Sequence, residues 1–526
     1  MCFSASAPVG NRCYGFHREA RSISRLVVQY GVVEEYSLIV DTLLKAAESD
    51  GARAAVADPQ RSLDFANLAR FACVMRRHVG KATSAPNIGL MLPSTCAFAG
   101  TFYGILWAGR TALPLNFLLQ PAELVAVVRD AGLDVVFTTK HFSRLADALP
   151  VKAIYMEDLP LKRDMLLQMA RSTPPAPTVS GDDVAVLLYT SGTSGVPKGV
   201  CQTYRNLTAD VSAAIAKAKL VSEHRFLGIL PLFHSFGLTT MLLVPVALKA
   251  SVYYLPRFQP RVMMDTIRER QISVTMMIAS MYAALLRAKD GGKEDLASLE
   301  YAVAGGEALP DSIFEQFKER FGVEIIQGYG MTEASPVVSL NVPWSNHMGT
   351  VGQPVPGVSV RAVDDDDNEL PRGQIGELWI KGPIVMKGYY QKPEETRAVL
   401  TTDGWYKSGD MGRVDDEGYI TITGRKKEMI IVGGENVYPR EVESVLEEYP
   451  AVHDAAVIGQ ADPSRGEVVV AFVTLREGEN ATEIEIRDYC RDRIAGYKQP
   501  RRVIIAEDFP RGPTGKILKR ELADLL

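Results

Sequence analysis

The segment Tyr189–Gly199, YTSGTSGVPKG, has the composition of a loop that binds phosphate groups. Its glycines let backbone N–H groups approach an anion, its hydroxyl groups can donate hydrogen bonds, and Lys198 supplies a positive charge. A Walker A loop has the spacing G-x-x-x-x-G-K-[ST], which this segment lacks, so a P-loop NTPase is excluded. The apolar run Val184–Tyr189 before the loop is typical of a strand buried on both faces. We therefore predict phosphate chemistry at the end of this strand.

A second group of polar residues follows another predicted strand. Asp311–Phe321 has apolar residues at helical spacing, and Gly322 can end that helix as its C-cap. The strand predicted next, Val323–Ile326, runs into QGYGMTE at 327–333. Open α/β sheets bind ligands where strands end in glycine-rich turns, so this segment is a second candidate for the site.

Short apolar runs alternate with amphipathic stretches from about Tyr36, which indicates an α/β fold. After Gly424 the pattern changes to short strands and two helices, predicted at 440–448 and 483–494. We predict an N-terminal extension over 1–35, a large domain over 36–424 and a small α+β domain over 425–526.

The composition excludes several classes of protein. The chain has 526 residues, 47% of them hydrophobic and 23% charged, as in soluble globular proteins. Lys and Arg number 58 and Asp and Glu 63, so the net charge of −5 gives no overall attraction to nucleic acid or anionic lipid, although a local basic patch is compatible with it. The six cysteines form no C-x-x-C pair and the seven histidines no H-E-x-x-H motif, so we expect no structural zinc. Scattered cysteines fit a reducing compartment, and we predict a cytoplasmic protein.

Two uncharged segments, 82–109 and 226–248, are long enough to span a membrane. Both contain prolines and polar residues, which favours a strand followed by a turn and a helix inside a globular fold. The first 30 residues carry four arginines and one acidic residue. That composition fits an organelle transit peptide, and equally a disordered extension or an upstream start codon.

The loop at 189–199 resembles the signature of the adenylate-forming superfamily, which includes acyl-CoA synthetases, peptide-synthetase adenylation domains and beetle luciferases. Further motifs match in the same order, over about residue 36 to the C-terminus: LPLFHSFG (230–237), QGYGMTE (327–333), GELWIKGP (376–383), YKSGD (406–410), GRKKEMI (424–430) and PTGK (513–516). So many motifs in one order are far more specific than a single loop. The fold class predicted is α/β, with a large N-terminal α/β domain of layered sheets and a small mobile C-terminal α+β domain.

The resemblance implies ATP and Mg²⁺, with CoA as co-substrate. The residues implied at the nucleotide are Thr190, Ser191, Gly192, Thr193, Ser194, Gly195 and Lys198 for the β- and γ-phosphates, Gly305, Gly306, Glu307, Gln327, Gly328, Tyr329 and Gly330 for adenine, and Asp410 and Arg425 for ribose. Thr332 is expected at the α-phosphate. Glu333 is expected to coordinate Mg²⁺, a hard cation that prefers oxygen ligands.

The resemblance also assigns residues to catalysis and to movement of the small domain. Lys516 would bridge the substrate carboxylate and the α-phosphate and offset the charge of two converging anions. Lys519 and Arg520, just beyond it, are interpreted as solvated. Lys427 falls at the hinge about which the small domain rotates between the two half-reactions. His234 would flank the carboxylate of the acid.

The segment PLFHSFGL indicates the kind of acid. Domains that activate amino acids carry an aspartate here for the substrate amine, and this sequence has none. We expect an acid with an apolar body. The residues predicted to line its pocket are Phe236, Leu238, Met241, Ile278, Ala279, Met281, Tyr282, Val337 and Val338, with Met241 or Tyr282 setting the length.

The function predicted is that of an ATP-dependent acyl-CoA synthetase acting on a medium- to long-chain fatty acid. The alternatives are an acyl–carrier-protein synthetase, an aryl or medium-chain acid CoA ligase and a luciferase-like oxygenase. A non-catalytic binding protein should have lost Lys516, Glu333 or Asp410, and all three are present. Expected partners are the fatty acid, ATP and CoA, with acyl carrier protein as an alternative acceptor, a transient peripheral contact with membranes, no transmembrane segment and no nucleic acid.

Overall fold

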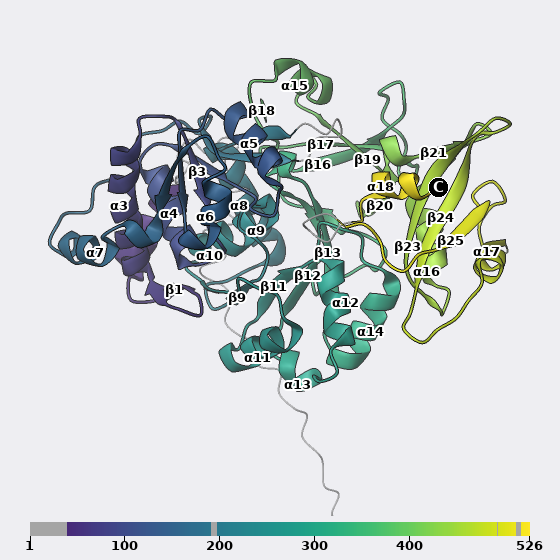
Figure 1. Cartoon of the computed structure of the whole chain (residues 1–526), viewed down its shortest axis with the longest axis horizontal. Helices are drawn as coiled ribbons and strands as arrows, with labels where there is room; N and C mark the ends of the chain where they lie inside the picture. Colours follow the sequence, from purple (N-terminus) through teal and green to yellow (C-terminus); the bar gives the residue numbers. More distant parts are fainter. Residues whose placement is uncertain (1–38, 191–196, 492, 512–516) are drawn as a thin grey trace, which may run out of the picture. The chain divides into compact units, whose positions relative to one another are not determined.

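The computed structural model of the chain describes residues 39–190, 197–491, 493–511 and 517–526. These residues belong to one compact unit that begins at Ser37, and they form four β-sheets (Figure 1). The predictions for residues 1–35, Ser191–Gly195 and Lys516 concern residues outside this description. Among the described residues, no helix combines the length and the apolarity needed to cross a bilayer.

The first sheet has the strand order β18-β8-β7-β4-β3-β5-β6. Its strands are β3 (Asn87–Met91), β4 (Thr111–Pro114), β5 (Val135–Thr138), β6 (Lys152–Tyr155), β7 (Val184–Thr190), β8 (Lys198–Thr203) and β18 (Gly388–Tyr389). The helices of this part are α2 (Ile39–Ser49), α3 (Phe65–Ala82), α4 (Cys96–Trp107), α5 (Pro121–Asp130), η1 (Lys140–Phe142), α6 (Ser143–Ala146), η2 (Met156–Asp158) and α7 (Leu161–Met169). Helix α4 is apolar on every side and almost wholly buried. The uncharged segment 82–109 is therefore a strand and a core helix, as predicted.

The second sheet has the order β15-β14-β13-β12-β11-β9-β10-β1-β2. Its strands are β1 (Ala54–Ala57), β2 (Ser62–Asp64), β9 (Arg225–Gly228), β10 (Ser251–Tyr254), β11 (Val274–Met277), β12 (Tyr301–Ala304), β13 (Ile325–Gly330), β14 (Val337–Leu340) and β15 (Gln353–Pro354). Its helices are α8 (Tyr204–Ala218), α9 (Ser235–Leu238), the π-helical turn η3 (Thr239–Leu243), α10 (Val244–Leu248), α11 (Pro260–Arg270), α12 (Ala279–Arg287), α13 (Lys293–Leu296), α14 (Asp311–Phe321) and η4 (Thr332–Ala334). The segment 226–248 is thus β9 followed by short buried helices, as predicted.

Strands β9, β11, β12 and β13 run parallel, so their carboxyl ends meet at one edge of the second sheet. The helix predicted over Asp311–Phe321 is α14, and Gly322 ends it with a left-handed φ of 69°. Strand β13 begins at Ile325 rather than Val323 and continues to Gly330. The motif QGYGMTE therefore starts inside the strand and not in the turn after it.

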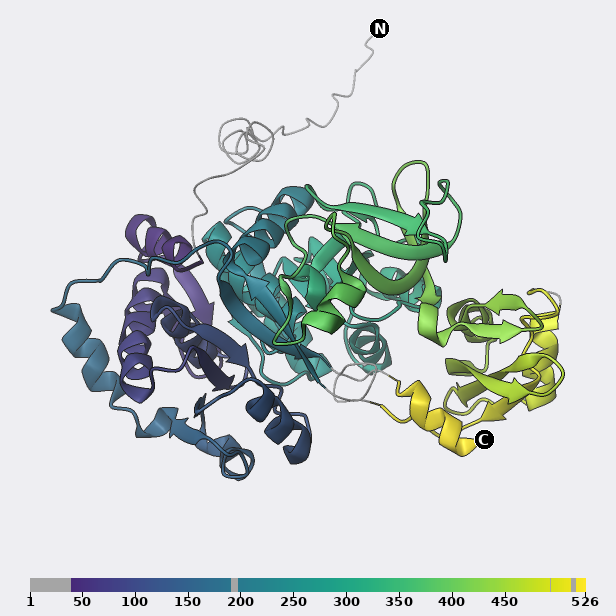
Figure 2. The same cartoon turned by 90° about the horizontal axis from the view of Figure 1, so that it is seen from above.

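The third sheet has the order β16-β17-β19-β20 and the fourth β22-β21-β24-β23, with β25 beside β24. The elements are β16 (Ser359–Val363), β17 (Gly376–Lys381), α15 (Pro393–Val399), β19 (Tyr406–Val414), β20 (Ile420–Arg425), η5 (Lys426–Glu428), β21 (Ile430–Val432), β22 (Glu435–Val437), α16 (Pro439–Glu447), β23 (Val452–Asp462), β24 (Gly466–Leu475), α17 (Glu483–Arg491), β25 (Arg502–Ile505), α18 (Lys519–Leu522) and η6 (Ala523–Leu525). Strands after residue 429 gather in a sheet of their own, yellow-green in Figure 2. The predicted class, α/β with layered sheets and a smaller α+β part, is confirmed, whereas the boundary at 424/425 and the mobility stay predictions.

Candidate active site

A cavity of about 670 Å³ lies against the second sheet, and its lining includes residues of the motifs LPLFHSFG and QGYGMTE. The predicted site residues Thr190, Lys198, Glu333, Asp410 and Arg425 are not part of this lining. Its polar lining residues include His234, Ser235, Glu307, Tyr329 and Thr332, and the part that they line is called the polar end. Its apolar lining residues, which define the apolar end, include Ala214, Ala218, Leu220, Leu230, Val274, Met276, Tyr301, Val303 and Leu340. A concave apolar space with a few convergent polar groups is the usual form of a small-molecule site.

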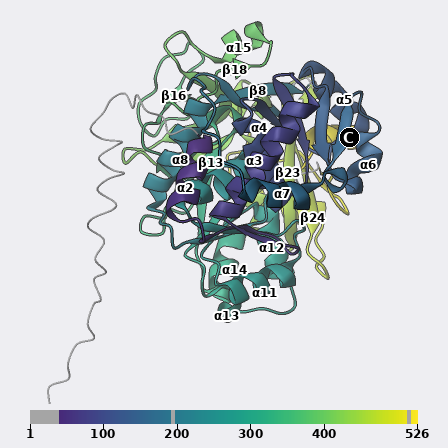
Figure 3. The ribbon, with the colours of Figure 1, turned by 90° about the vertical axis from the view of Figure 1, so that its left-hand side faces the viewer.

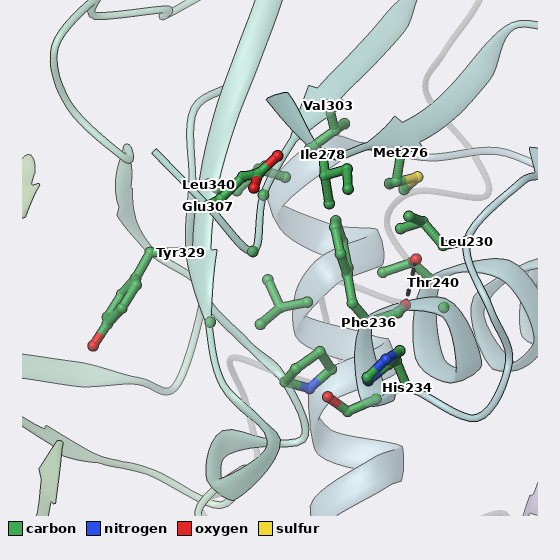
Figure 4. Close-up of a pocket in the computed structure, with 18 of the residues that line it drawn as sticks. Leu230, His234, Phe236, Thr240, Met276, Ile278, Val303, Glu307, Tyr329 and Leu340 are labelled. Atoms are coloured by element: carbon green, nitrogen blue, oxygen red, sulfur yellow. Dashed lines mark hydrogen bonds between the residues drawn. The ribbon is translucent and has the colours of Figure 1, made fainter. Parts of the chain in front are cut away.

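The apolar end follows from the alternation of side chains along two strands. Val274 and Met276 on β11 and Tyr301 and Val303 on β12 point to the same face, because successive side chains of a strand alternate. In Figure 4, Ile278 and His234 lie at opposite ends of the Phe236 side chain, which occupies the cavity between them.

Helix α8 faces these strands with two small residues. Ala214 and Ala218 are four positions apart and so lie on one side of the helix, where both line the cavity. Their short side chains leave the space between helix and sheet open.

The structure corrects the predicted acyl pocket. Four predicted residues line the cavity: Phe236, Ile278, Met281 and Val337. Five do not: Leu238, Met241, Ala279, Tyr282 and Val338. The ring of Tyr282 packs edge-on against Phe317 in a separate core, with ring centroids 5.1 Å apart. Met241 is fully buried, so neither of the two proposed length-setting residues reaches the cavity.

Tyr301 is a large lining residue that was not predicted. Its hydroxyl group donates a hydrogen bond of 2.7 Å to the carbonyl oxygen of Ala218 at the end of α8. Its ring also packs edge-on against His224, with centroids 5.4 Å apart. In the sequence, the alternation of side chains in YAVAG predicts that Tyr301 and Val303 lie on one face of a strand. It does not predict that α8 covers that face.

Glycines allow close packing of the chain at the polar end. A Cβ at Gly305 would lie 3.1 Å from the Phe236 ring, and one at Gly330 would lie 2.1 Å from the Pro336 carbonyl oxygen. Gly306 has a φ of 83°, which disfavours any other residue. The other predicted adenine residues in the lining are Glu307, Gly328 and Tyr329, whereas Gln327 is not part of it.

Asp410 lies at the centre of a buried hydrogen-bond group. It is 4% exposed and faces Arg425 across the β19–β20 pair. The hydroxyl group of Tyr329 donates to one carboxylate oxygen at 2.6 Å, and Arg425 Nε donates to the other at 2.9 Å. The nearby carboxylate raises the pKa of Arg425. Tyr329 accordingly points away from the apolar cavity in Figure 4, and its motif meets the YKSGD and GRKKEMI motifs here.

Glu333 is the second carboxylate of the site and is half-buried. Burial raises its pKa, and the hydroxyl group of Tyr389 donates to its Oε1 atom at 3.0 Å. The Lys198 ammonium lies 5.1 Å from the centroid of the same Tyr389 ring. Sequence reasoning missed Tyr389, because it reaches Glu333 only through the pairing of β18 with β8.

The surroundings of Glu333 fit a hard cation in one respect. A cation would stabilise the charged form of this carboxylate, which desolvation disfavours. The described residues contain no cluster of three His, Cys, Asp or Glu side chains. A cation here would therefore take most of its ligands from phosphate oxygens and water, which is how Mg²⁺ is usually held.

His234 enters the cavity as a neutral imidazole. Burial lowers its pKa to about 4, and its Nε2 atom has no hydrogen-bond partner among the described residues. The neighbouring Ser235 hydroxyl lies 3.2 Å from the hydroxyl of Thr332. The motifs LPLFHSFG and QGYGMTE are therefore joined at the polar end of the cavity.

The interpretation of Lys519 as a solvated residue is wrong. Its ammonium lies 2.6 Å from the carboxylate of Glu443 and 3.6 Å from that of Glu428. Glu443 is 5% exposed and also accepts a hydrogen bond from the Val457 N–H group at 2.9 Å. Lys427 lies in the turn η5 together with Glu428, so Lys519 contacts the turn that was predicted to be the hinge.

Comparison with known proteins agrees with this arrangement. Residues 43–390 match the family model of AMP-binding enzymes, and residues 441–516 match the C-terminal domain of AMP-binding enzymes. A long-chain-fatty-acid–CoA ligase of Bacillus subtilis is 34% identical over 483 residues, 83% of this chain and 85% of that protein. A feruloyl-CoA synthase of Amycolatopsis is 34% identical over 466 residues, 88% of this chain and 93% of that protein. The crystal structure of ATP-bound MatB from Rhodopseudomonas palustris has a TM-score of 0.85 at 27% identity and covers 92% of this chain and 98% of that one.

The chain therefore belongs to the AMP-binding enzymes. Within them, the predicted acyl-CoA synthetase branch of the adenylate-forming superfamily is confirmed, and its activity is that of an AMP-forming acid–thiol ligase.

Proposed function

We propose that the protein activates a medium- to long-chain fatty acid with ATP as acyl-AMP, releases pyrophosphate, and transfers the acyl group to the thiol of CoA. The observation that supports this best is one cavity whose lining includes both His234 and Thr332 and a group of apolar side chains. A carboxylate at the polar end would place an apolar chain between β11, β12 and α8.

The residue roles form part of the proposal. Lys198 and Thr190 would hold phosphate oxygens together with Ser191–Gly195, and Thr332 would contact the α-phosphate. Asp410 would accept hydrogen bonds from ribose, with Arg425 beside it. Lys516 would bring its charge to the substrate carboxylate during adenylation.

The metal belongs to the same proposal. Glu333 would hold Mg²⁺, which supplies charge neutralisation at the phosphates. Tyr389 orients the Glu333 carboxylate through its hydrogen bond.

The lining of the cavity favours a fatty acid over an amino acid. Glu307 is the one carboxylate among its described lining residues, and the backbone N–H group of Ser280 already donates to it at 2.9 Å. An ammonium group would thus meet no free carboxylate in the apolar part. From Ile278 to Val274 the wall extends over roughly 13 Å, which suits an extended chain. The relatives include a feruloyl ligase, so an aryl acid is the second candidate.

A panel of free acids tests the proposal. Acetate, hexanoate, decanoate, palmitate, ferulate and leucine are each incubated with ATP and Mg²⁺, with CoA and separately with acyl carrier protein, and AMP and thioester are measured. We expect kcat/KM to rise from acetate to at least decanoate with CoA as acceptor. The highest kcat/KM on ferulate would support the aryl candidate, and thioester formed with carrier protein alone would identify that acceptor.

A further inference from the structure

Helix α7 exposes an apolar face of three residues. Leu166, Leu167 and Met169 are 68%, 46% and 65% exposed. The opposite face is fixed on α3, where Asp164 lies 2.9 Å from His78. The helix is thus held in place by a polar contact while these three side chains are exposed. Figure 3 shows the ribbon of α7 on the side that faces the viewer. Exposed apolar residues gathered on one element mark a binding surface more often than scattered ones do.

The two helices carry an excess of positive charge. Helices α3 and α7 together have six basic residues and one acidic residue, and Arg171 follows two positions after α7. Two acidic residues, Glu157 and Asp158, precede α7 in η2, and Asp158 is paired with Lys140. The acidic residue, Asp164, is paired with His78 and with Arg163. The whole chain has a net charge of −5, so these two helices concentrate positive charge against the overall balance.

The positive charge of α3 and α7 distinguishes between the partners that could bind the exposed apolar face of α7. A second copy of the chain, docked face to face, would bring the same cations opposite one another. Residues 1–30 of the chain carry four arginines and one acidic residue, so they too have the same sign of charge. An anionic lipid bilayer has phosphate groups for the cations and an acyl layer for the apolar side chains.

We propose that the α7 surface, formed by Lys162, Arg163, Leu166, Leu167, Met169 and Arg171, docks on an anionic lipid bilayer. The apolar side chains enter the boundary between headgroups and acyl chains, and the cations bind headgroup phosphates. This surface lies outside the cavity residues, so the inference goes beyond the ligase reaction and does not depend on it.

Vesicle co-sedimentation with the full chain tests the proposal. One set of vesicles is phosphatidylcholine alone, and the other is equal parts of phosphatidylcholine and phosphatidylglycerol. The variants are Leu166→Ser with Met169→Ser, and Lys162→Gln with Arg163→Gln. Ile484→Ser is the matched control, because Ile484 is 62% exposed but lies on α17 between Glu483 and Glu485.

We expect wild type to bind the anionic vesicles and not the neutral ones, with binding that weakens as salt is added. Each double variant should lose roughly tenfold or more in binding, and the Ile484 variant should bind like wild type. Equal binding by all proteins, or no binding by wild type, would overturn the proposal. Loss of self-association in the α7 variants, measured by light scattering without vesicles, would identify a second copy as the occupant instead. Ligase activity on a water-soluble acid should be the same in all of them, so a failure here leaves the proposed reaction untouched.

Discussion

At the scale of single residues, the electrostatics of the cavity depend on His234 carrying no charge. Burial lowers its pKa to about 4, so between pH 5 and 8 its imidazole is neutral. In the proposed reaction, the positive charge for two converging anions would come from Lys198, Arg425 and Lys516. A neutral ring beside the carboxylate avoids holding the acid in an ion pair that adenylation would have to break.

The lowered pKa of His234 makes stability depend on pH. The pKa of His234 is about 4 in the folded protein and its ordinary value is 6.5, so below pH 6.5 the unfolded chain binds a proton that the folded protein does not. The stability that the neutral ring contributes is therefore complete above pH 6.5 and is lost as the pH falls toward 4. Between pH 7 and pH 5 the free energy of unfolding should fall by about 2 kcal/mol more in wild type than in His234→Gln. Urea unfolding of both proteins at the two pH values measures this difference. Equal losses would show that the folded protein does not lower the pKa of His234.

At the scale of elements, α8, β11 and β12 set the depth of the cavity. Ala214→Leu should shift the preferred acid to shorter chains, because its larger side chain fills the space opposite β11. Each methylene that no longer fits should cost about 0.8 kcal/mol, or about fourfold in kcat/KM. Tyr301→Val should shift the preference to longer chains, because it removes a ring from the apolar lining.

The control for the chain-length series is Ala216→Leu, on the same helix but outside the cavity lining. It should leave the preferred chain length unchanged. Wild type and the three variants are compared on straight-chain acids by AMP release with CoA present. If Ala214→Leu and Ala216→Leu change the preference equally, the acid does not bind along α8.

The local sequence pattern predicted the helices and strands better than it predicted the residues that line the cavity. Helix α14 matches its prediction because both signals, the spacing of its apolar residues and the C-cap Gly322, depend only on residues close together in the sequence. Tyr282 was misplaced because its apolar neighbours fit a pocket and a second core equally well. Tyr389 and Tyr301 could not be found from sequence, since their contacts depend on which strand or helix lies beside them. The motifs thus predicted several residues of the polar end, whereas the residues of the apolar end could be identified only from the tertiary structure.

The Lys519 contact joins α16 to the segment that follows Lys516 and to η5. We expect Lys519→Met to slow acyl-AMP formation roughly tenfold while changing thioester formation from supplied acyl-AMP much less, because only the first step needs Lys516 held in place. Lys519→Arg should restore most of the rate. Pyrophosphate exchange and a direct thioester assay separate the two steps.

Two further variants distinguish a role of Lys519 in positioning Lys516 from a role in stability alone. Arg520→Met is the matched control, since Arg520 is 76% exposed, and it should behave as wild type. Adding Glu443→Gln to Lys519→Met removes the unpaired buried charge, so the melting temperature should recover while adenylation stays slow. If Lys516→Ala abolishes adenylation and Lys519→Met does not alter it, Lys519 serves stability alone.

At the scale of the whole molecule, one active site must serve two reactions in turn. In the proposed reaction, adenylation would need Lys516 near the acid, whereas thioester formation would need a path for the CoA thiol to the same carbon. We propose that residues 425–526 rotate about Lys427 between the two steps. Lys427 is exposed in the short turn η5, between β20 of the third sheet and β21 of the fourth, where a change of backbone angles would redirect everything that follows.

Lys427→Pro tests this rotation, because proline fixes φ at one value and thereby restricts the change. Pyrophosphate exchange should remain within about twofold of wild type, while thioester formation from supplied acyl-AMP should fall roughly a hundredfold, since the barrier to a conformational step limits only the second reaction. Lys427→Ala is the control, because it removes the same side chain but leaves φ free, and it should keep both half-reactions. Circular dichroism and the melting temperature report whether the proline variant is folded. Loss of both half-reactions in a folded Lys427→Pro protein would mean that η5 supports the adenylation geometry itself, and retention of both would place the hinge at another residue.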